Sequence, residues 1–192
     1  MEEKQLAWKL VKSEHVLQDK WIDFRKEAYK MPDGTVFEPY YTYSRRSYAV
    51  IAARDETGKY LCVRQYRQGI GEVTIEFPAG GIENFGKTDY EKTGKEEDPL
   101  AAAKRELLEE TGYVSDQWRH LITIPSNATL ADNYAHVYFA DQCRKVGNQD
   151  LDETEFMNVT RRSGTELDEL IREGKFQQAI HVMAWLMIKQ IL

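Results

Sequence analysis

Three glutamates, Glu106, Glu109 and Glu110, fall within five consecutive residues of one short segment. Glu106 and Glu110 are four residues apart, so on an α-helix their carboxylates lie on one face, about one turn apart. Glu109 borders the same face. Crowded carboxylates repel one another unless a cation lies among them. The segment therefore predicts a helix that carries either a divalent-metal site or an unfavourable cluster of charge.

The flanking residues also predict a helix. Asp98 is a good N-cap, and Pro99 suits the first helical position. Gly112 is expected to form a left-handed C-terminal cap. Arg105 lies four residues before Glu109 and can pair with its carboxylate. The apolar stripe of this helix is expected to comprise Leu100, Ala103, Leu107 and Leu108.

Composition and charge exclude several classes of protein. The chain has 192 residues, of which 42% are apolar and 30% charged, as in ordinary globular domains. Its net charge of -6 argues against a general nucleic-acid surface, and an anionic substrate would need bound cations or local arginines. No apolar run reaches the roughly eighteen residues of a membrane span, and no signal-peptide core is present. Cys62 and Cys143 lack metal-type spacing, so we expect reduced thiols in a cytoplasmic protein.

Alternation and turn signals predict strands along most of the chain, with two helices near its end. Residues 84–96 form a polar stretch that predicts an exposed loop. His136 and His181 fall in the interiors of predicted elements, where packed structural roles are favoured over catalysis. The strands are expected at 8–16, 22–29, 36–43, 47–53, 60–66, 74–77, 118–124, 135–140 and 155–159, and the later helices at 164–173 and 177–192. Strands and helices mixed in this order favour an α/β (α+β) fold with a mixed sheet.

The glutamate segment resembles the signature of the Nudix hydrolases, G-x5-E-x7-R-E-U-x-E-E-x-G-U, in which U is apolar. The match runs from Gly80 to Glu97 and then through Arg105 and the three glutamates to Gly112. Sixteen residues separate Gly80 from Glu97 where the family has five, so about eleven residues are inserted, within Glu83 to Glu96. The resemblance implies a Nudix-type α/β/α sandwich. It divides the chain into an N-terminal β region, residues 1–46, and a Nudix hydrolase domain, residues 47–192.

The resemblance also assigns a metal site. Glu106 and Glu110 are expected to bind the metal directly, together with the backbone carbonyl of Ala79, and Glu109 is expected to bind directly or through water. Arg105 is counted with the catalytic residues. Oxygen ligands of this kind suit Mg²⁺, which retains several waters, and Mn²⁺ is a possible substitute. Bound dications can clamp the attacking and leaving oxygens of a diphosphate.

A general base is expected in the acidic segment Gln149 to Phe156. In relatives that cleave nucleoside diphosphate sugars, this region supplies the glutamate that deprotonates water or completes the metal shell. Glu153 and Glu155 both fit. We favour Glu153 as the base and Glu155 as a metal ligand, and the alternative is a solvated acidic loop.

Four segments resemble the ADP-ribose and nucleoside diphosphate sugar pyrophosphatase branch of the family: Lys20 to Phe24, the turn Asp33-Gly34, Val36 to Glu38 and Gln65 to Gly80. Arg67 matches an arginine that grips a phosphate, and Arg46 matches one that reaches the nucleotide from a second subunit. Trp21 and Phe37 match aromatics that sandwich the base, with core packing as the competing explanation. In that branch the N-terminal strands are exchanged between two subunits, so a homodimer is implied. Neither a nucleic acid nor a membrane is expected as a partner.

The resemblance favours hydrolysis of ADP-ribose to AMP and ribose 5-phosphate, with GDP-mannose or another nucleotide sugar as the alternative. Ala128 stands where the ADP-ribose branch usually has proline, so the loop differs where selectivity for the sugar could be set. A Nudix-fold module that binds a nucleotide sugar without cleaving it is the non-enzymatic hypothesis. Removal of damaged nucleoside triphosphates is a third.

Overall fold

The computed structural model describes residues 5–83 and 97–191, and the chain forms two compact units within them. The first runs to Arg46 and includes residues 125–134, and the second contains the other described residues. The insertion expected within Glu83 to Glu96 therefore lies outside the described residues, apart from Glu83 itself. Each unit is presented by itself.

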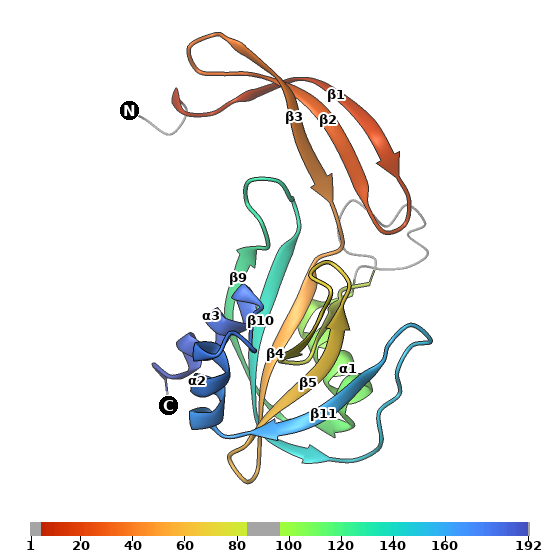
Figure 1. The fold of residues 1–192 in the computed structure, drawn as a ribbon, viewed down its shortest axis with the longest axis vertical. Helices are drawn as coiled ribbons and strands as arrows, with labels where there is room; N and C mark the ends of the chain where they lie inside the picture. The colour runs from red at the N-terminus through yellow and green to blue at the C-terminus, as the bar shows by residue number, and fades with distance from the viewer. Residues whose placement is uncertain (1–4, 84–96, 192) are drawn as a thin grey trace. The chain divides into compact units, whose positions relative to one another are not determined.

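The first unit is a three-stranded antiparallel sheet of β1 (Lys9–Gln18), β2 (Asp23–Lys30) and β3 (Val36–Ser44), in that order (Figure 1). The β2–β3 turn contains Gly34 at φ 91°, a left-handed conformation that glycine adopts easily. Residues 125–134 join this sheet through backbone contacts. The amide of Tyr43 donates to the carbonyl of Leu130 at 2.8 Å.

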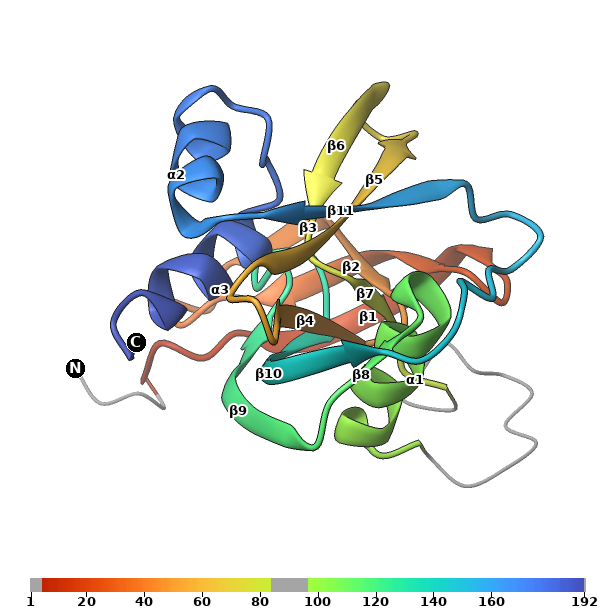
Figure 2. The same ribbon diagram turned by 90° about the horizontal axis from the view of Figure 1, so that it is seen from below.

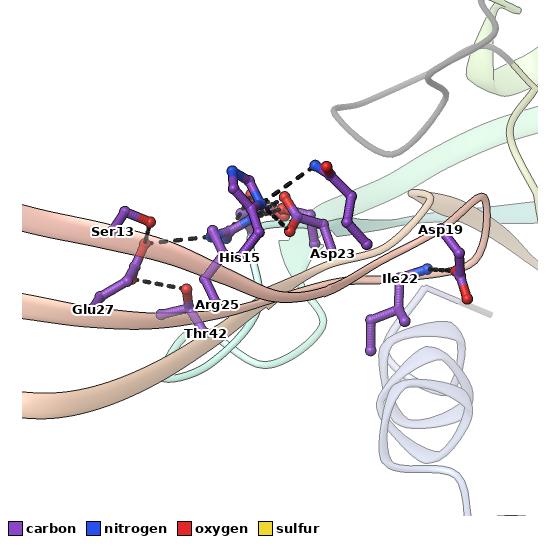
Figure 3. Close-up of polar contacts among 11 residues, drawn as sticks. Ser13, His15, Asp19, Ile22, Asp23, Arg25, Glu27 and Thr42 are labelled. Atoms are coloured by element: carbon purple, nitrogen blue, oxygen red, sulfur yellow. Dashed lines mark hydrogen bonds and ion pairs between the residues drawn. The ribbon is translucent and has the colours of Figure 1, made fainter.

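A polar network fixes the middle of this small sheet (Figure 3). The buried carboxylate of Glu27 accepts hydrogen bonds from the side chains of Ser13, Arg25, Tyr29 and Thr42. Burial alone would raise the pKa of Glu27, but these hydrogen bonds bring it below its usual value. The network borders a concave pocket of about 630 Å³, which Trp8 and Tyr40 also line. The side chains of this network, which come from β1, β2 and β3, therefore have their hydrogen-bond partners within the first unit.

The second unit is built on a mixed sheet. β4 pairs in parallel with β10 and antiparallel with β5, and β5 pairs antiparallel with β6 and β11. Eight of the strands in the described residues belong to this sheet. They are β4 (Tyr48–Asp55), β5 (Tyr60–Arg67), β6 (Glu72–Glu76), β7 (Ala79–Gly81), β8 (Tyr113–Val114), β9 (Gln117–Pro125), β10 (Tyr134–Lys145) and β11 (Met157–Arg162).

Helices cover both faces of this sheet (Figure 2). α1 (Pro99–Thr111) lies on one face, and α2 (Gly164–Arg172) and α3 (Ala179–Ile188) lie on the other. Alternate residues of β4 point into the two cores, as the period of a strand requires. Val50 packs with Trp185 of α3, whereas Ile51 packs with Leu107 of α1. The predicted α/β/α sandwich with a mixed sheet is confirmed.

Most predicted elements agree with the structure to within a few residues. The strand predicted at 155–159 begins at Met157, and the C-terminal helix is limited to Ala179–Ile188. The short strands β7 and β8 were not predicted. Leu108 was expected in the apolar stripe of α1, but it is 41% exposed, so that expectation was wrong. Leu107 and Ala103 carry the contact with the sheet instead.

Both cysteines are free and buried, in agreement with the expected reduced thiols. Among the described residues, no helix combines the length and the apolar character needed to cross a bilayer.

Candidate active site

Helix α1 begins and ends where the sequence predicts. The Asp98 carboxylate accepts hydrogen bonds from the amides of Leu100 and Ala101, both at 3.0 Å, and Pro99 is the first helical residue. Gly112 ends the helix at φ 73°. The face of α1 that meets the sheet packs there through Ala103 and Leu107. That face carries Glu106 and Glu110, which are only 7% and 2% exposed.

The two buried glutamates contact the strand β7. A Cβ atom on Gly80 would lie 2.0 Å from the carboxylate carbon of Glu106, so only glycine fits at this position. The amide of Ala79 donates to Glu110 Oε2 at 3.0 Å. The acidic face of α1 therefore lies against β7, the segment Ala79–Gly81. Carboxylate oxygens and the backbone of Ala79 and Gly80 meet at one place.

Arg105 holds this face in position through four groups. Its Nη1 donates to Glu106 at 2.8 Å and to Glu109 at 2.9 Å, and its Nη2 donates to the carbonyl of Gly81 at 2.9 Å. Glu97 accepts from Nε and Nη2, both at 3.0 Å, in a bidentate pair. The expected Arg105–Glu109 pair is thus present. The role of Glu97 in holding Arg105 was missed, because a motif match alone does not show what a residue contacts.

The carboxylates of Glu106 and Glu110 resist ionisation. Burial, together with the weaker effects of the charges of Glu109 and Glu155, raises the pKa of Glu106 to about 7 against the opposing effect of Arg105. Burial raises the pKa of Glu110 well above its usual value, and the neighbouring charge of Glu106 adds to this. Two buried carboxylates at this spacing are stabilised as anions when a cation lies between them.

Divalent metal ions suit the donor atoms of this site. Within the described ranges, no three acidic, histidine or cysteine side chains converge closely enough to enclose an ion. Glu106 and Glu109 are instead bonded to Arg105, and Glu110 is bonded to the Ala79 amide. Mg²⁺ needs only one or two carboxylates because it keeps several waters. The raised pKa values of Glu106 and Glu110 also indicate an unmet demand for positive charge, so the residues fit such an ion.

Arg67 is held by a buried carboxylate. Its Nε and Nη2 donate to the two oxygens of Glu76 at 2.9 and 2.5 Å, and Glu76 is fully buried. The nearby charge of Glu110 raises the pKa of Arg67 as well, after the larger effect of the Glu76 hydrogen bond. The paired contact with Glu76 therefore restricts the orientation of the Arg67 guanidinium.

Gln65 is a polar residue that the sequence analysis missed. It lies two residues before Arg67, on the same face of β5. Its buried side-chain nitrogen Nε2 has no hydrogen-bond partner among the described residues. A buried amide in this state is an available donor. Residues two apart in a strand lie on one face, so the positions of Val63, Gln65 and Arg67 in the predicted strand could have placed Gln65 on the same face as Arg67.

The acidic segment after β10 is bonded to the end of α1. The amide of Asp150 donates to the carbonyl of Glu109 at 2.9 Å, and Gln149 Nε2 donates to the carbonyl of Glu110 at 2.7 Å. Glu155 is half-buried, and its charge contributes to the raised pKa of both Glu106 and Glu110. Glu153 is exposed. The structure thus brings Glu155 into the electrostatic environment of the α1 glutamates.

The expected base-binding residues lie in the first unit. Trp21 and Phe37 are 62% and 46% exposed, and Arg46 is exposed as well. Trp21 precedes β2, whereas Phe37 pairs with Tyr29 near the far end of that strand. The two rings therefore lie at opposite ends of the sheet, and one chain does not bring them together.

This chain is similar to a family model and to several known proteins. A model described as NUDIX domain matches residues 44–186. An ADP-ribose pyrophosphatase of Bacillus subtilis is 30% identical over 98% of this chain and 97% of its own length. A methanol dehydrogenase activator of Bacillus methanolicus is 30% identical over 92% of this chain and 89% of its own.

One further relative and one solved structure are also similar to this chain. An ADP-sugar pyrophosphatase of Mus musculus is 36% identical over 65% of this chain and 64% of its own length. A crystal structure described as an ADP compounds hydrolase shares the fold with a TM-score of 0.80 at 18% identity, covering 96% of this chain and 94% of that one. The helix of three glutamates against Gly80 and the match over residues 44–186 lead to one conclusion: this chain belongs to the NUDIX family.

Proposed function

We propose that this chain is a Mg²⁺-dependent pyrophosphohydrolase that splits a nucleoside diphosphate sugar, with ADP-ribose as the substrate and AMP and ribose 5-phosphate as the products. The observation that carries the proposal is the placement of Glu106 and Glu110, buried and side by side, against the backbone of Ala79 and Gly80. The relatives named ADP-ribose pyrophosphatase and ADP-sugar pyrophosphatase support the choice of substrate class.

The metal would be held by Glu106, Glu110 and the carbonyl of Ala79, with Glu109 as a further or water-mediated ligand. When bound, Mg²⁺ would neutralise diphosphate oxygens and make a bound water more acidic. Arg105 keeps the carboxylates of Glu106 and Glu109 in place through hydrogen bonds of 2.8 and 2.9 Å, and Glu97 keeps Arg105 in place. Arg105 would thus act as a positioning residue.

The acidic segment would remove a proton from the attacking water. We favour Glu153 for this role and Glu155 for a place in the metal shell. The effect of Glu155 on the pKa values of Glu106 and Glu110 supports its assignment. The exposure of Glu153 leaves its side chain free to reach a water beside the substrate. General-base catalysis of this kind contributes about 10²- to 10⁴-fold to a rate.

Arg67 would bind a substrate phosphate. Glu76 engages Nε and Nη2, which leaves Nη1 as the donor for the phosphate. The unpartnered Nε2 of Gln65 is a second donor on the same face of β5. Guanidinium and amide donors of this kind neutralise and orient a diphosphate.

The first unit would bind the base and form a homodimer by exchange of N-terminal strands. All ten residues of β1 are exposed, and they include Val11, Val16 and Leu17. A long, exposed strand with apolar side chains is usually covered in the functional assembly. Since Trp21 and Phe37 lie apart on one sheet, a sandwich around the base would take one ring from each subunit, and Arg46 would come from the second.

A substrate panel tests the proposal. ADP-ribose, GDP-mannose and a nucleoside triphosphate are each incubated with Mg²⁺, Mn²⁺ or a chelator, and the products are separated by chromatography. We expect AMP and ribose 5-phosphate from ADP-ribose, and loss of both with the chelator. Saturable binding without product would instead support a nucleotide-sugar binding module. Release of inorganic pyrophosphate from the triphosphate would support removal of damaged nucleotides.

A further inference from the structure

The last two residues of β6, Ile75 and Glu76, and the next residue, Phe77, are hydrogen-bonded to the chain around the start of helix α3. Phe77 begins the segment Phe77–Gly81, called the metal loop below because the proposed metal site lies beside it. The amide of Ile75 donates to the carbonyl of Lys175 at 3.3 Å. Gln178 Nε2 donates to Glu76 Oε1 at 3.4 Å, and the amide of Phe77 donates to His181 Nδ1 at 3.1 Å. The chain from residue 175 to 181 thus contacts the backbone amides of Ile75 and Phe77 and the side chain of Glu76, about one hundred residues away in sequence.

His181 makes the buried contact of this set. It is 4% exposed, and its ring lies nearly parallel to that of Phe77, with centroids 6.3 Å apart. Since Nδ1 accepts the Phe77 amide proton, the neutral ring carries its own proton on Nε2. Burial lowers the pKa of His181 to about 4, which keeps the ring neutral and Nδ1 available as an acceptor near neutral pH.

The Phe77 amide begins a run of fixed peptide groups. The carbonyl of Pro78 accepts from the amide of Ile51 at 2.9 Å, and the amide of Ala79 donates to Glu110 at 3.0 Å. The next residue, Gly80, contacts Glu106. Each peptide from Phe77 to Ala79 therefore has a partner, and His181 provides the first. Proline at 78 has no amide hydrogen, so the Phe77 amide is the last donor before Ala79.

We propose that His181 is a positioning residue for the metal loop, which acts by fixing the Phe77 peptide and through it the carbonyl of Ala79. This inference rests on the proposed function. It assigns a role to α3, a helix from which the sequence predicted packing alone. Removal of the acceptor at position 181 would let the Phe77–Ala79 backbone move relative to Glu106 and Glu110. Changes in such supporting contacts weaken metal binding by about 10- to 100-fold.

Two substitutions of His181 separate its role as an acceptor from its role in packing. In His181→Asn, the side-chain oxygen can occupy the place of Nδ1, while ring volume is lost. In His181→Leu, much of the volume is kept and the acceptor is lost. Phe176→Leu is the matched control, because the ring of Phe176 packs against both Phe77 and His181 without a polar contact to the loop.

The measurement is the Mn²⁺ dissociation constant of the substrate-free protein, from electron paramagnetic resonance, beside the Mg²⁺ dependence of ADP-ribose hydrolysis. We expect His181→Leu to weaken Mn²⁺ binding by about tenfold or more, and His181→Asn and Phe176→Leu to stay within about threefold of wild type. Circular dichroism checks that each variant folds. If His181→Leu does not fold, His181→Met replaces it, since methionine also lacks a strong acceptor and adapts to irregular cavities.

The opposite ranking would overturn the inference, because a packing role predicts that His181→Asn and Phe176→Leu suffer more than His181→Leu. Equal Mn²⁺ binding by wild type and His181→Leu would also overturn the positioning role of His181. The proposed function would still stand in that case if the wild type hydrolyses ADP-ribose. Wild-type protein that neither binds Mn²⁺ nor hydrolyses any substrate would overturn both.

Discussion

The carboxylate of Glu106 occupies the space that a side chain at position 80 would need. A Cβ atom built on Gly80 would lie 2.0 Å from the carboxylate carbon and 2.2 Å from each oxygen of Glu106. This contact explains why a glycine and a glutamate, far apart in the sequence, occur together in the family signature. The loop and the helix meet at van der Waals distance only when residue 80 has no side chain.

Gly80→Ala should therefore displace the Glu106 carboxylate. We expect the turnover number with Mg²⁺ to fall by about 100-fold, because a displacement of about 1 Å in catalytic groups costs a rate of that order. Steady-state kinetics with ADP-ribose measures this. Gly69→Ala is the control, because a Cβ at Gly69 would meet no atom within 4 Å. Equal activity of the two variants would contradict the assigned contact.

Glu110→Gln should remove a metal ligand without loss of the fold. Glu110 is 2% exposed and its pKa is raised well above the usual value, so a neutral amide of the same shape is tolerated in the metal-free protein. We expect turnover to fall by about 100-fold or more, while the melting temperature without metal stays the same or rises. Glu169→Gln, on the exposed side of α2, should change neither quantity. Wild-type turnover in Glu110→Gln would refute the ligand assignment.

Glu153→Gln and Glu155→Gln should differ in how their activity depends on metal. If Glu153 is the base, its variant loses about 10²- to 10⁴-fold in turnover with an unchanged Mg²⁺ requirement. Glu155→Gln should raise the Mg²⁺ concentration needed for half-maximal activity. Titration of Mg²⁺ at saturating substrate distinguishes the two. The reverse result would exchange the roles, and wild-type behaviour in both would favour a solvated acidic loop.

Strand β1 should mediate self-association. Val11 is 59% exposed in the first unit, and a lysine there would place a charge in the proposed interface. We expect sedimentation experiments to show a dimer for wild type and a shift toward monomer for Val11→Lys. Val146→Lys alters a valine that is 55% exposed beyond the end of β10, and it should leave the dimer intact. A monomeric wild type would contradict the exchange of strands.

His181 should make stability depend on pH. Its folded pKa of about 4 lies below the ordinary value of 6.5, so the unfolded chain binds more protons between these two values. Stability is thus fully present above pH 6.5 and falls as the pH approaches 4, by up to about 1.4 kcal/mol per pH unit. His181→Leu lacks this titration, so the difference in unfolding free energy between wild type and variant should shrink as the pH falls. Urea unfolding across this range tests it, and a constant difference would contradict a buried neutral His181.

The ends of α1 were predictable because Asp98, Pro99 and Gly112 act through local hydrogen bonds and local backbone conformation. Strands β7 and β8 were not predictable, since three and two residues are too few for an alternating pattern. The exposure of Leu108 has a related cause. Glu106 and Glu110 occupy part of the inward face of α1, and a rule that places apolar residues inside cannot anticipate buried carboxylates.

The other features that the sequence did not predict are contacts between residues far apart in the chain. The pairing of Arg105 with Glu97 and Gly81, and the support of Phe77 by His181, depend on how distant elements pack. The family signature predicted that Glu106 and Glu110 lie close to Ala79 and Gly80. It gave no sign of the helix that supports the loop from the other face of the sheet.

The proposed metal site at Glu106 and Glu110 is tested most directly by a Mn²⁺ titration, followed by electron paramagnetic resonance, of the wild-type protein and of the double variant Glu106→Gln, Glu110→Gln. We expect the wild type to bind Mn²⁺ and the folded double variant not to bind it. Equal Mn²⁺ binding by both proteins would contradict the proposed site, because the ion would then be held elsewhere.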